Sequence, residues 1–466
     1  MDKVPKPSFL SLSFDHSYLV KNGKPFFWLA DTWWYGATSR MKWPESFKTL
    51  VRDRKRKGFT VIQIVVGYPP EIDLSSKNAR NSGGAPFDNE GKVNSKYFDE
   101  VDKKIKYLVE NGLVPCIVGG WGNHIDILGV DKIKKLWQEI ISRYSHYPVV
   151  FCLCGELDLP DLASTNTTEG SPYSYAKKFV SILPNPLRKR AINAGRKIKM
   201  LLSSQKRESK LKNRIEKWQE VARFIKITDP HKRLVTAHVS QKSTADSILG
   251  HPNWLDIDSI QSGHGKDRIP FMVEAILNSK KMIINLEPWY EGILGNFNDY
   301  NQRVAFWLCV LSGAKGHSYG AHGIWQMADN DNFMKHWGNS DWKKSINFPG
   351  ALQLGKSVKF LQNYEWWKMS PDFTIVNPSW NSNNPYNPVA AAIGEYLVFV
   401  YFPNVNLKQK FTLSLSKGKD FSEISWINTQ TLIMIEREKI KNQVFHVKFP
   451  KNVNNKDMLC ILSINK

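Results

Sequence analysis

The stretch Met282-Ile-Ile-Asn-Leu-Glu-Pro-Trp-Tyr-Glu-Gly292 opens as a short apolar run and ends in a carboxylate beside Pro, Trp and Tyr. A second stretch, Val149-Val-Phe-Cys-Leu-Cys-Gly-Glu-Leu-Asp158, has the same form. Near-continuous apolar runs are typical of strands that are buried on both faces of a parallel sheet. Each stretch therefore places an acid, Glu287 or Glu156, at the carboxyl end of a predicted buried strand.

Outward from these two stretches, apolar runs alternate with amphipathic helical patterns. The predicted strands cover residues 25–34, 60–66, 113–118, 149–153, 234–238, 255–260 and 282–286, with a Gly-punctuated segment from 316. Eight strand-then-helix steps predict an α/β fold, a (β/α)8 TIM barrel over residues 1–371. A doubly wound sheet is the alternative, but it usually carries a Gly-rich fingerprint after its first strand, and Asp31-Thr-Trp-Trp34 is not one.

The pattern changes in two places. A basic helical insertion interrupts the barrel at about 161–215, and residues 188–217 alone hold 12 Lys or Arg against two Glu. From 372 to 466, alternating runs such as Tyr396-Leu-Val-Phe-Val-Tyr401 are separated by turn residues. These runs predict a small antiparallel β-sandwich as a C-terminal domain.

The formal net charge is +22, from 65 Lys and Arg against 43 Asp and Glu. Such a charge favours anionic partners. Binding to nucleic acid needs a basic stripe interleaved with aromatic platforms. Here most of the aromatic residues lie in the barrel and the charge excess lies in the insertion, so no nucleic acid is expected. The insertion is either a solvated helical lid or a docking element for an anionic glycan.

The sequence at the N-terminus bears on localisation. The segment Met1-Asp-Lys-Val-Pro-Lys-Pro7 lacks the apolar core of a signal peptide, and no window of the chain reaches ~18 apolar residues. By this criterion the protein is expected to be cytoplasmic and to have no membrane span. The five cysteines lie mostly in apolar runs and are predicted to be free buried thiols.

Two acids at strand ends indicate a chemistry. Cleavage of a glycosidic bond needs one carboxyl group to protonate the leaving oxygen and a second as nucleophile or base. The first must keep its proton, so burial or a neighbouring carboxylate must raise its pKa. Glu156 follows the fourth predicted strand and Glu287 the seventh. The alternative hypothesis is that Glu156 and Glu287 are structural carboxylates, each paired with a Lys or Arg. If the register is off by two, the acids are Asp158 or Glu291.

Further residues near strand ends could contact a sugar. Asp31 could accept two hydroxyl groups beside the indole of Trp33, although it could instead cap the following helix. Trp121 and Tyr290 add aromatic faces. Three histidines, His124, His264 and His317, are also predicted to line the substrate site. His238 and His322 lie at similar positions near strand ends. Either a metal or hydrogen bonds to sugar hydroxyls would explain them, but no HxH or HExxH spacing is present, and neither metal nor cofactor is predicted.

Several stretches resemble one known family, the apiosidase-like glycoside hydrolases, which are retaining enzymes acting on plant pectin side chains and related glycans. They are Lys24-Pro-Phe-Phe-Trp-Leu-Ala-Asp-Thr-Trp33, Lys57-Gly-Phe-Thr-Val-Ile-Gln63, Trp254-Leu-Asp-Ile-Asp-Ser-Ile-Gln-Ser-Gly-His264, Asn285-Leu-Glu-Pro-Trp-Tyr-Glu-Gly292, the segment 305–320, Phe348-Pro-Gly-Ala-Leu-Gln353 and Trp366-Trp-Lys-Met-Ser-Pro371. The resemblance covers residues 9–371 apart from the insertion. The tail, with Ser425-Trp-Ile-Asn-Thr-Gln430, resembles the β-sandwich that commonly follows this barrel and was named for collagen binding; we interpret it as a packing or glycan-binding module.

The resemblance implies roles for the two acids. The acid/base of the family is an Asp after two glycines, and this position falls on Glu156; the nucleophile, a Glu before Pro, falls on Glu287. The chain departs from the family in having Glu in place of that Asp, and Cys154 in place of the second glycine. Members of the family are usually secreted or periplasmic.

Together these observations predict a hydrolase that cleaves glycosidic bonds of a plant or bacterial polysaccharide or oligosaccharide with retention of configuration. The alternative is a non-catalytic protein that binds a glycan or an anionic polymer on a glycosidase-like barrel.

Overall fold

The computed structural model describes residues 9–465 apart from 72, 160–207, 241–242, 266, 408, 416–419 and 452–455. Most of the insertion predicted at 161–215 lies outside the described residues. Its last part, from 208, belongs to a helix that continues to residue 228.

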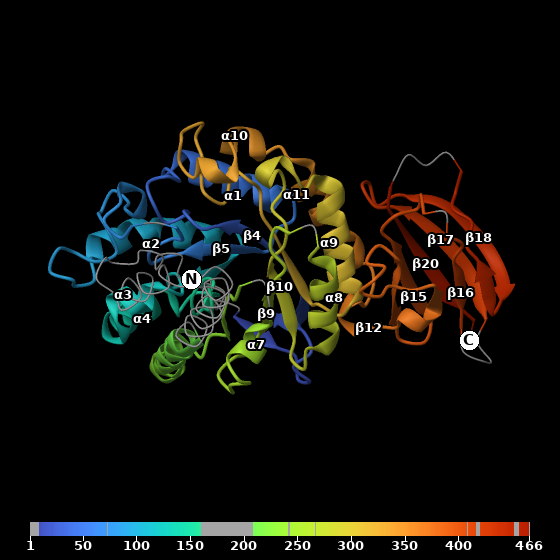
Figure 1. The fold of residues 1–466 in the computed structure, drawn as a ribbon, viewed down its shortest axis with the longest axis horizontal. Coiled ribbons are helices and arrows are strands. Elements are labelled where there is room, and N and C mark those ends of the chain that lie inside the picture. Colours follow the sequence, from blue (N-terminus) through green and yellow to red (C-terminus); the bar gives the residue numbers. More distant parts are fainter. Residues whose placement is uncertain are drawn as a thin grey trace, which may run out of the picture.

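A parallel eight-stranded sheet forms the centre of the molecule (Figure 1). Its strands, in chain order, are β4 (Trp28–Trp33), β5 (Val61–Val65), β6 (Val114–Val118), β7 (Val150–Cys152), β8 (Val235–Thr236), β9 (Asp258–Gln261), β10 (Ile283–Glu287) and β11 (Gly316–Tyr319). Nearly every residue of these strands is buried, because helices cover the outside and side chains fill the inside.

The barrel is nearly closed. The spatial order of the strands runs from β8 through β4 to β9, and β11 pairs with β4. At the seam between β8 and β9, side chains take over part of the closure. Thr236 Oγ1 donates to the carbonyl of Ile257 at 2.9 Å, and the hydroxyl of Ser259 donates to the carbonyl of Ala237.

The helices that follow the strands pack apolar faces against the sheet. They are α1 (Glu45–Arg56), α2 (Ser95–Glu110), α3 (His124–Leu128), α4 (Val130–Tyr144), α7 (Ala245–Ile248), α8 (Ile269–Asn278), α9 (Asp299–Leu311), α10 (Trp342–Ser345) and α11 (Pro349–Leu361). Short 3-10 turns lie at η1 (Lys77–Ala79), η2 (Ile293–Gly295), η3 (Lys335–Trp337), η4 (Trp366–Lys368) and η5 (Phe373–Ile375). In α4, for example, Leu136, Trp137, Ile140 and Ile141 form one buried face at helical spacing.

A small antiparallel sheet precedes the barrel. It consists of β1 (Leu10–Leu12), β2 (Leu19–Lys21) and β3 (Lys24–Phe26). Residues of its first turn, such as Asp15 and Ser17, line a cavity together with Met282, which directly precedes β10. This sheet therefore lies at the amino ends of the barrel strands and leaves the carboxyl ends open.

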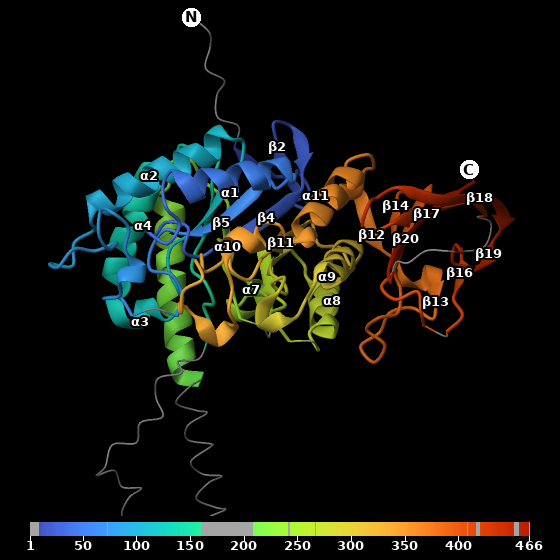
Figure 2. The same cartoon turned by 90° about the horizontal axis from the view of Figure 1, so that it is seen from above.

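Two antiparallel sheets follow the barrel and lie beside it, next to α9 (Figures 1 and 2). One contains β12 (Met369–Pro371), β14 (Val389–Ile393), β15 (Leu397–Phe402), β17 (Phe421–Asn428), β18 (Met434–Asn442) and β20 (Met458–Ile464); the other contains β13 (Val376–Asn377), β16 (Thr412–Ser414) and β19 (Val444–His446). Side chains from both, including Val400, Trp426 and Leu413, form a separate apolar core. The expected domain boundary at 371 falls at the end of β12.

The predicted fold class, a (β/α)8 barrel followed by an antiparallel β-sandwich, is confirmed. Among the described residues, no helix is long and apolar enough to cross a membrane. The five cysteines are all buried and free.

Candidate active site

Glu287 is the last residue of β10, and an irregularity in that strand sets its direction. The pairing of β10 with β9 shifts by one residue between Asn285 and Glu287, so Leu286 is the extra residue of a bulge. Gln63 of β5 donates to the Leu286 carbonyl across the barrel at 3.0 Å. Bulges of this kind re-aim side chains beside functional sites. The carboxylate of Glu287 consequently lies at the carboxyl end of the barrel, only 5% exposed.

Two histidines hold Glu287 in the same manner. The Nε2 atoms of His238 and His264 each lie 3.2 Å from an oxygen of the Glu287 carboxylate. The Nδ1 atom of His238 accepts the backbone N–H of Glu156 at 3.1 Å, and that of His264 faces the N–H of Tyr290 at 3.4 Å. Because Nδ1 is the acceptor in both, a ring in its neutral form carries its proton on Nε2, the atom that faces Glu287.

Glu156 follows β7 in a strained turn. Its backbone has φ of 41°, in the left-handed region that a residue with a Cβ seldom adopts. The preceding Gly155 forms a parallel bridge with Trp121, whose ring would clash with any side chain at that position. Trp121 Nε1 donates to Glu156 Oε2 at 3.0 Å. The turn and the indole together point the Glu156 carboxyl group at Glu287.

Gln261, the last residue of β9, links the two acids. Its Nε2 atom donates to Glu156 Oε1 and to Glu287 Oε1, both at 2.9 Å. These two oxygens are therefore no more than twice that distance apart. One amide group can serve both carboxyl groups because it carries two N–H donors.

The two acids have opposite electrostatic environments. Burial, followed by the nearby charge of Glu287, raises the pKa of Glu156 above its ordinary value. Burial also opposes ionisation of Glu287, but the hydrogen bonds from His238 and His264 outweigh it and hold the pKa of Glu287 well below its ordinary value. The pair therefore favours one protonated and one ionised carboxyl group.

A small pocket of about 60 Å³ opens above the two acids. Half of its lining residues are aromatic, His264 included, and most come from the loops that follow the strands. The lining residues are Trp34, Pro70, Glu71, Trp121, Glu156, Gln261, His264, Glu287, Tyr290, Ile293, Trp325 and Trp337. Trp34 Nε1 donates to the Tyr290 hydroxyl at 2.9 Å, and Tyr290 in turn hydrogen bonds with Glu287. Aromatic faces beside carboxylates at this end of a barrel form a site suited to a sugar ring.

Of the residues predicted to bind substrate, Trp121, His264 and Tyr290 line this pocket, and four others lie behind it. Asp31 is fully buried and accepts hydrogen bonds from Arg54 Nε and Trp33 Nε1, both at 2.6 Å. Trp33 packs edge-on against Phe47 in the core. Asp31 and Trp33 thus support the start of the turn that carries Trp34 into the pocket.

The remaining two predicted residues are buried histidines. His124 Nδ1 accepts the backbone N–H of Trp121 at 3.0 Å and so positions that indole from behind. His317 lies in β11 with its ring against Phe306 of α9, between the sheet and the helix that covers it. Burial lowers the pKa of His124 to about 4 and that of His317 to about 3, so both rings are neutral near neutral pH.

The alternative acids occupy other places. Asp158 accepts hydrogen bonds from the backbone N–H and the hydroxyl of Ser240 and joins two loops. Glu291 lies in a different cavity, where it accepts hydrogen bonds from the Tyr319 hydroxyl and the backbone N–H of Gly350. Within the described parts of the chain, no group of three or more His, Cys, Asp or Glu side chains is arranged so that it could hold a metal ion.

Sequence reasoning did not select Trp34, Gln261, His238, Trp325, Trp337 or Glu71 for the site. A signal existed for Gln261, which directly follows a predicted strand as Glu287 does. For Trp34 the signal was ambiguous, because two adjacent indoles follow Asp31. Trp325, Trp337 and Glu71 come from long loops whose course the sequence pattern does not specify.

The structure is a parallel barrel in which two carboxyl groups lie in an aromatic pocket, at the ends of the fourth and seventh strands. This is the form of a glycoside hydrolase barrel. The family model described as "Apiosidase-like, catalytic domain" matches residues 13–368. The chain belongs to this family, and the resemblance stated from the sequence is confirmed.

Solved structures show the same fold. One described as a glycoside hydrolase is 19% identical, with a TM-score of 0.70, and the match covers 98% of this chain and 97% of that one. A glycoside hydrolase family 5 protein from Bacteroides vulgatus ATCC 8482 is also 19% identical, with a TM-score of 0.73 over 98% and 92% of the two chains. No curated protein matches the sequence.

Proposed function

We propose that the protein is a retaining glycoside hydrolase in which Glu287 is the nucleophile and Glu156 the acid/base. The observation that carries the proposal is the bridge through Gln261 Nε2, which brings both carboxyl groups to one pocket. The opposite shifts of their pKa values support the assignment, because the nucleophile must be ionised while the acid keeps its proton.

The spacing of the acids supports retention. Inverting enzymes keep their two carboxyl groups about 6.5–9.5 Å apart to hold a water, whereas retaining enzymes keep them about 5–5.5 Å apart. Two oxygens that each lie 2.9 Å from the same nitrogen are at most twice that distance apart, and this close approach favours the retaining arrangement. The same geometry shows that the Glu at position 156, where the family has Asp, can still place its carboxyl group within hydrogen-bond distance of the Gln261 amide.

The reaction would run in two steps. A Glu287 oxygen attacks the anomeric carbon and forms a glycosyl ester, while the bond to the leaving oxygen breaks and Glu156 gives its proton to that oxygen. Glu156, now a carboxylate, takes a proton from water as the water attacks the anomeric carbon, and Glu287 leaves. His238, His264 and Tyr290 hold the nucleophile, and Trp121 orients the acid.

The first experiment is turnover of a panel of aryl glycosides and of plant and bacterial polysaccharides. We expect Glu287→Gln and Glu156→Gln each to lower kcat by about 10³-fold or more, equivalent to about 4 kcal/mol, on polysaccharides, where the leaving group needs a proton. Glu291→Gln tests the alternative acid in the other cavity, and Glu90→Gln, at an exposed acid, is the control. NMR of the first-formed sugar should show the anomeric configuration of the substrate.

Three outcomes would contradict parts of the proposal. Activity that survives both pocket changes but is lost in Glu291→Gln would move the chemistry to the other cavity. Inverted product would overturn the role of Glu287 as nucleophile. Binding of a glycan without any turnover by the wild type would favour the non-catalytic alternative.

A further inference from the structure

A second and much larger cavity lies on the other side of the segment that follows β10. Its volume is about 620 Å³, against about 60 Å³ for the pocket that holds the two acids. Tyr290 and Ile293 of this segment line the small pocket. Trp289, Glu291, Gly292 and residues 295–298, of which all but Phe297 are exposed, line the large cavity, which Phe348, Pro349 and Tyr386 complete. One segment of backbone therefore forms a wall of both.

The chemistry of the lining indicates the class of ligand. Trp289 and Phe297 stack with 5.1 Å between their rings, and Phe348 and Tyr386 add partly exposed aromatic surface. Asn296, Asn298 and Asn301 present side-chain amides, which both donate and accept hydrogen bonds. A mixture of aromatic faces and amides suits a polyhydroxylated ring, and the volume is in the range of ligand sites, about 300–1,000 Å³.

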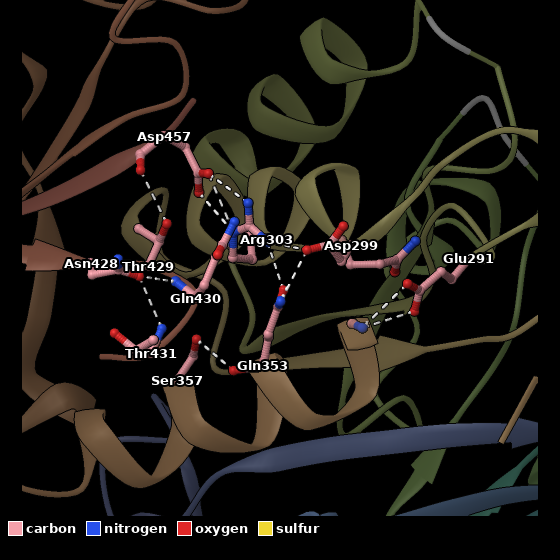
Figure 3. A network of polar contacts seen from close by, with 12 residues as sticks. Glu291, Asp299, Arg303, Gln353, Ser357, Asn428, Thr429, Gln430, Thr431 and Asp457 are labelled. Atoms are coloured by element: carbon pink, nitrogen blue, oxygen red, sulfur yellow. Dashed lines mark hydrogen bonds and ion pairs between the residues drawn. The ribbon is translucent and has the colours of Figure 1, made fainter. Parts of the chain in front are cut away.

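The charged side chains of the cavity indicate whether its ligand is neutral or charged. Among the described lining residues they are Glu291 and Asp299, both acidic (Figure 3). An anionic sugar would meet no positively charged side chain among these lining residues. A free cation is disfavoured as well, because protein groups already bind both carboxylates. Glu291 accepts from Tyr319 and Gly350, and Asp299 pairs with Arg303 at 2.8 Å. What the cavity offers is therefore hydrogen bonding and aromatic contact without net attraction for ions.

We propose that this cavity is a second binding site for a neutral glycan, distinct from the pocket around Glu156 and Glu287. The inference rests on the proposed function, since it assigns the cavity to the same polysaccharide that the small pocket would cleave. Because the pocket itself is small, it can hold only a small part of a polymer. A site on the other face of the 289–298 segment would retain a remote part of the chain while one unit reacts. Tyr386 comes from the loop between β13 and β14, so the C-terminal part of the chain would contribute directly to substrate binding.

The test measures binding apart from cleavage. Full-length Glu287→Gln protein is run by affinity electrophoresis through gels that contain galactomannan, xyloglucan or arabinan as neutral polymers, or polygalacturonate as an anionic one. We expect retardation by at least one neutral polymer and less by polygalacturonate. Adding Tyr386→Ala should weaken the binding by about 10-fold, as for a central aromatic contact. Adding Asn301→Ala should weaken it by about 3-fold, as for one hydrogen bond.

Tyr396→Ala and Asn363→Ala are the matched controls, because both side chains are exposed and neither lines the cavity. Thermal melting shows whether each variant folds. If Tyr386→Ala does not fold, Asn301→Ala alone tests the cavity. The proposal would be overturned if the cavity variants bound as well as the controls. It would also be overturned if none of the polymers retarded the protein, or if polygalacturonate alone did. Failure of the proposed function is a separate result, because it would appear as missing turnover by wild-type protein whatever the gels show.

Discussion

At the scale of single residues, Gln261 opposes the rise in the pKa of Glu156, one member of the proposed catalytic pair. Turnover needs Glu287 ionised, so the rate should rise as pH increases through the lowered pKa of Glu287. It also needs Glu156 protonated, so the rate should fall as pH increases through the raised pKa of Glu156. The hydrogen bond from Gln261 favours the ionised form of Glu156 and so limits how far its pKa can rise.

Replacing this amide by an apolar group of similar length should move one limb of the pH profile. In Gln261→Met, the alkaline limb of kcat/KM should shift to higher pH, because Glu156 loses a donor to its charged form. The acidic limb should shift less, since His238 and His264 still hold Glu287. We also expect kcat to fall by roughly 10- to 100-fold, because loss of the bridge frees both carboxyl groups. Rates at a series of pH values measure both effects, and an alkaline limb that moves to lower pH would contradict this role.

The residues of the site divide clearly into those that the sequence could and could not predict. Glu156, Glu287, Trp121, Tyr290 and His264 were predictable because they follow apolar runs, and the carboxyl ends of parallel strands meet at one site. The choice between Trp33 and Trp34 was not predictable. It depends on where the strand ends and on the bond between Trp33 and Asp31, which turns that indole into the core.

At the scale of elements, two long loops meet over the pocket. Glu71, in the loop after β5, accepts hydrogen bonds from His336 Nε2 at 2.8 Å and Trp337 Nε1 at 3.1 Å, in the loop after β11. Glu71 has φ of 50°, so its backbone is held in the left-handed region. The bridge fixes Trp337, whose ring meets the imidazole of His264 edge-on at 6.1 Å.

Removal of the bridge should change substrate binding more than chemistry. In Glu71→Ala, Trp337 loses the acceptor that holds it at the rim, and we expect KM to rise by about 5- to 10-fold, as for loss of hydrogen bonds to a charged group, with a smaller change in kcat. Glu90→Ala is the matched control, because Glu90 is exposed in the same loop and pairs only with neighbouring Lys92 among the contacts of described residues. An equal fall of kcat with unchanged KM would show instead that Glu71 acts on the reaction.

The prediction of elements succeeded where burial gives a strong pattern. The barrel strands read as apolar runs because they are buried on both sides. In the C-terminal sheets, β18 was not predicted, since its sequence Met434-Ile-Glu-Arg-Glu-Lys-Ile-Lys-Asn442 is dominated by charges. It lies at the edge of the sheet, where such residues remain in water.

At the scale of the whole molecule, one buried ion pair joins the barrel to the C-terminal sheets. Arg303 of α9 contacts Asp457, which directly precedes β20, at 2.8 Å, and both side chains are at most 1% exposed (Figure 3). The Tyr401 hydroxyl donates to the same carboxylate at 3.0 Å. Arg303 also bonds to Asp299 and Gln353, at 2.8 and 2.6 Å, so the pair extends toward the large cavity.

Breaking this pair from one side should destabilise the protein strongly. In Asp457→Asn the Arg303 guanidinium stays buried without its main counter-charge, which costs about 3–5 kcal/mol. Asp420→Asn, at an exposed site of the same sheets, should change the free energy of unfolding by less than about 0.5 kcal/mol. Urea denaturation measures both values. A loss below about 1 kcal/mol in Asp457→Asn would show that the two parts are held together chiefly by apolar contacts.

The seam of the barrel has a consequence for how this chain could change over evolution. Between β8 and β9 the closure relies in part on the hydroxyls of Thr236 and Ser259. The segment that leads into a strand at such an edge can become longer without breaking a continuous ladder of backbone hydrogen bonds, because no such ladder closes this side of the barrel. The segment 153–234 that leads into β8 is the longest connection between consecutive barrel strands, and it contains the basic insertion. We therefore expect the connection that leads into this edge strand to accept added sequence with little disturbance of the barrel.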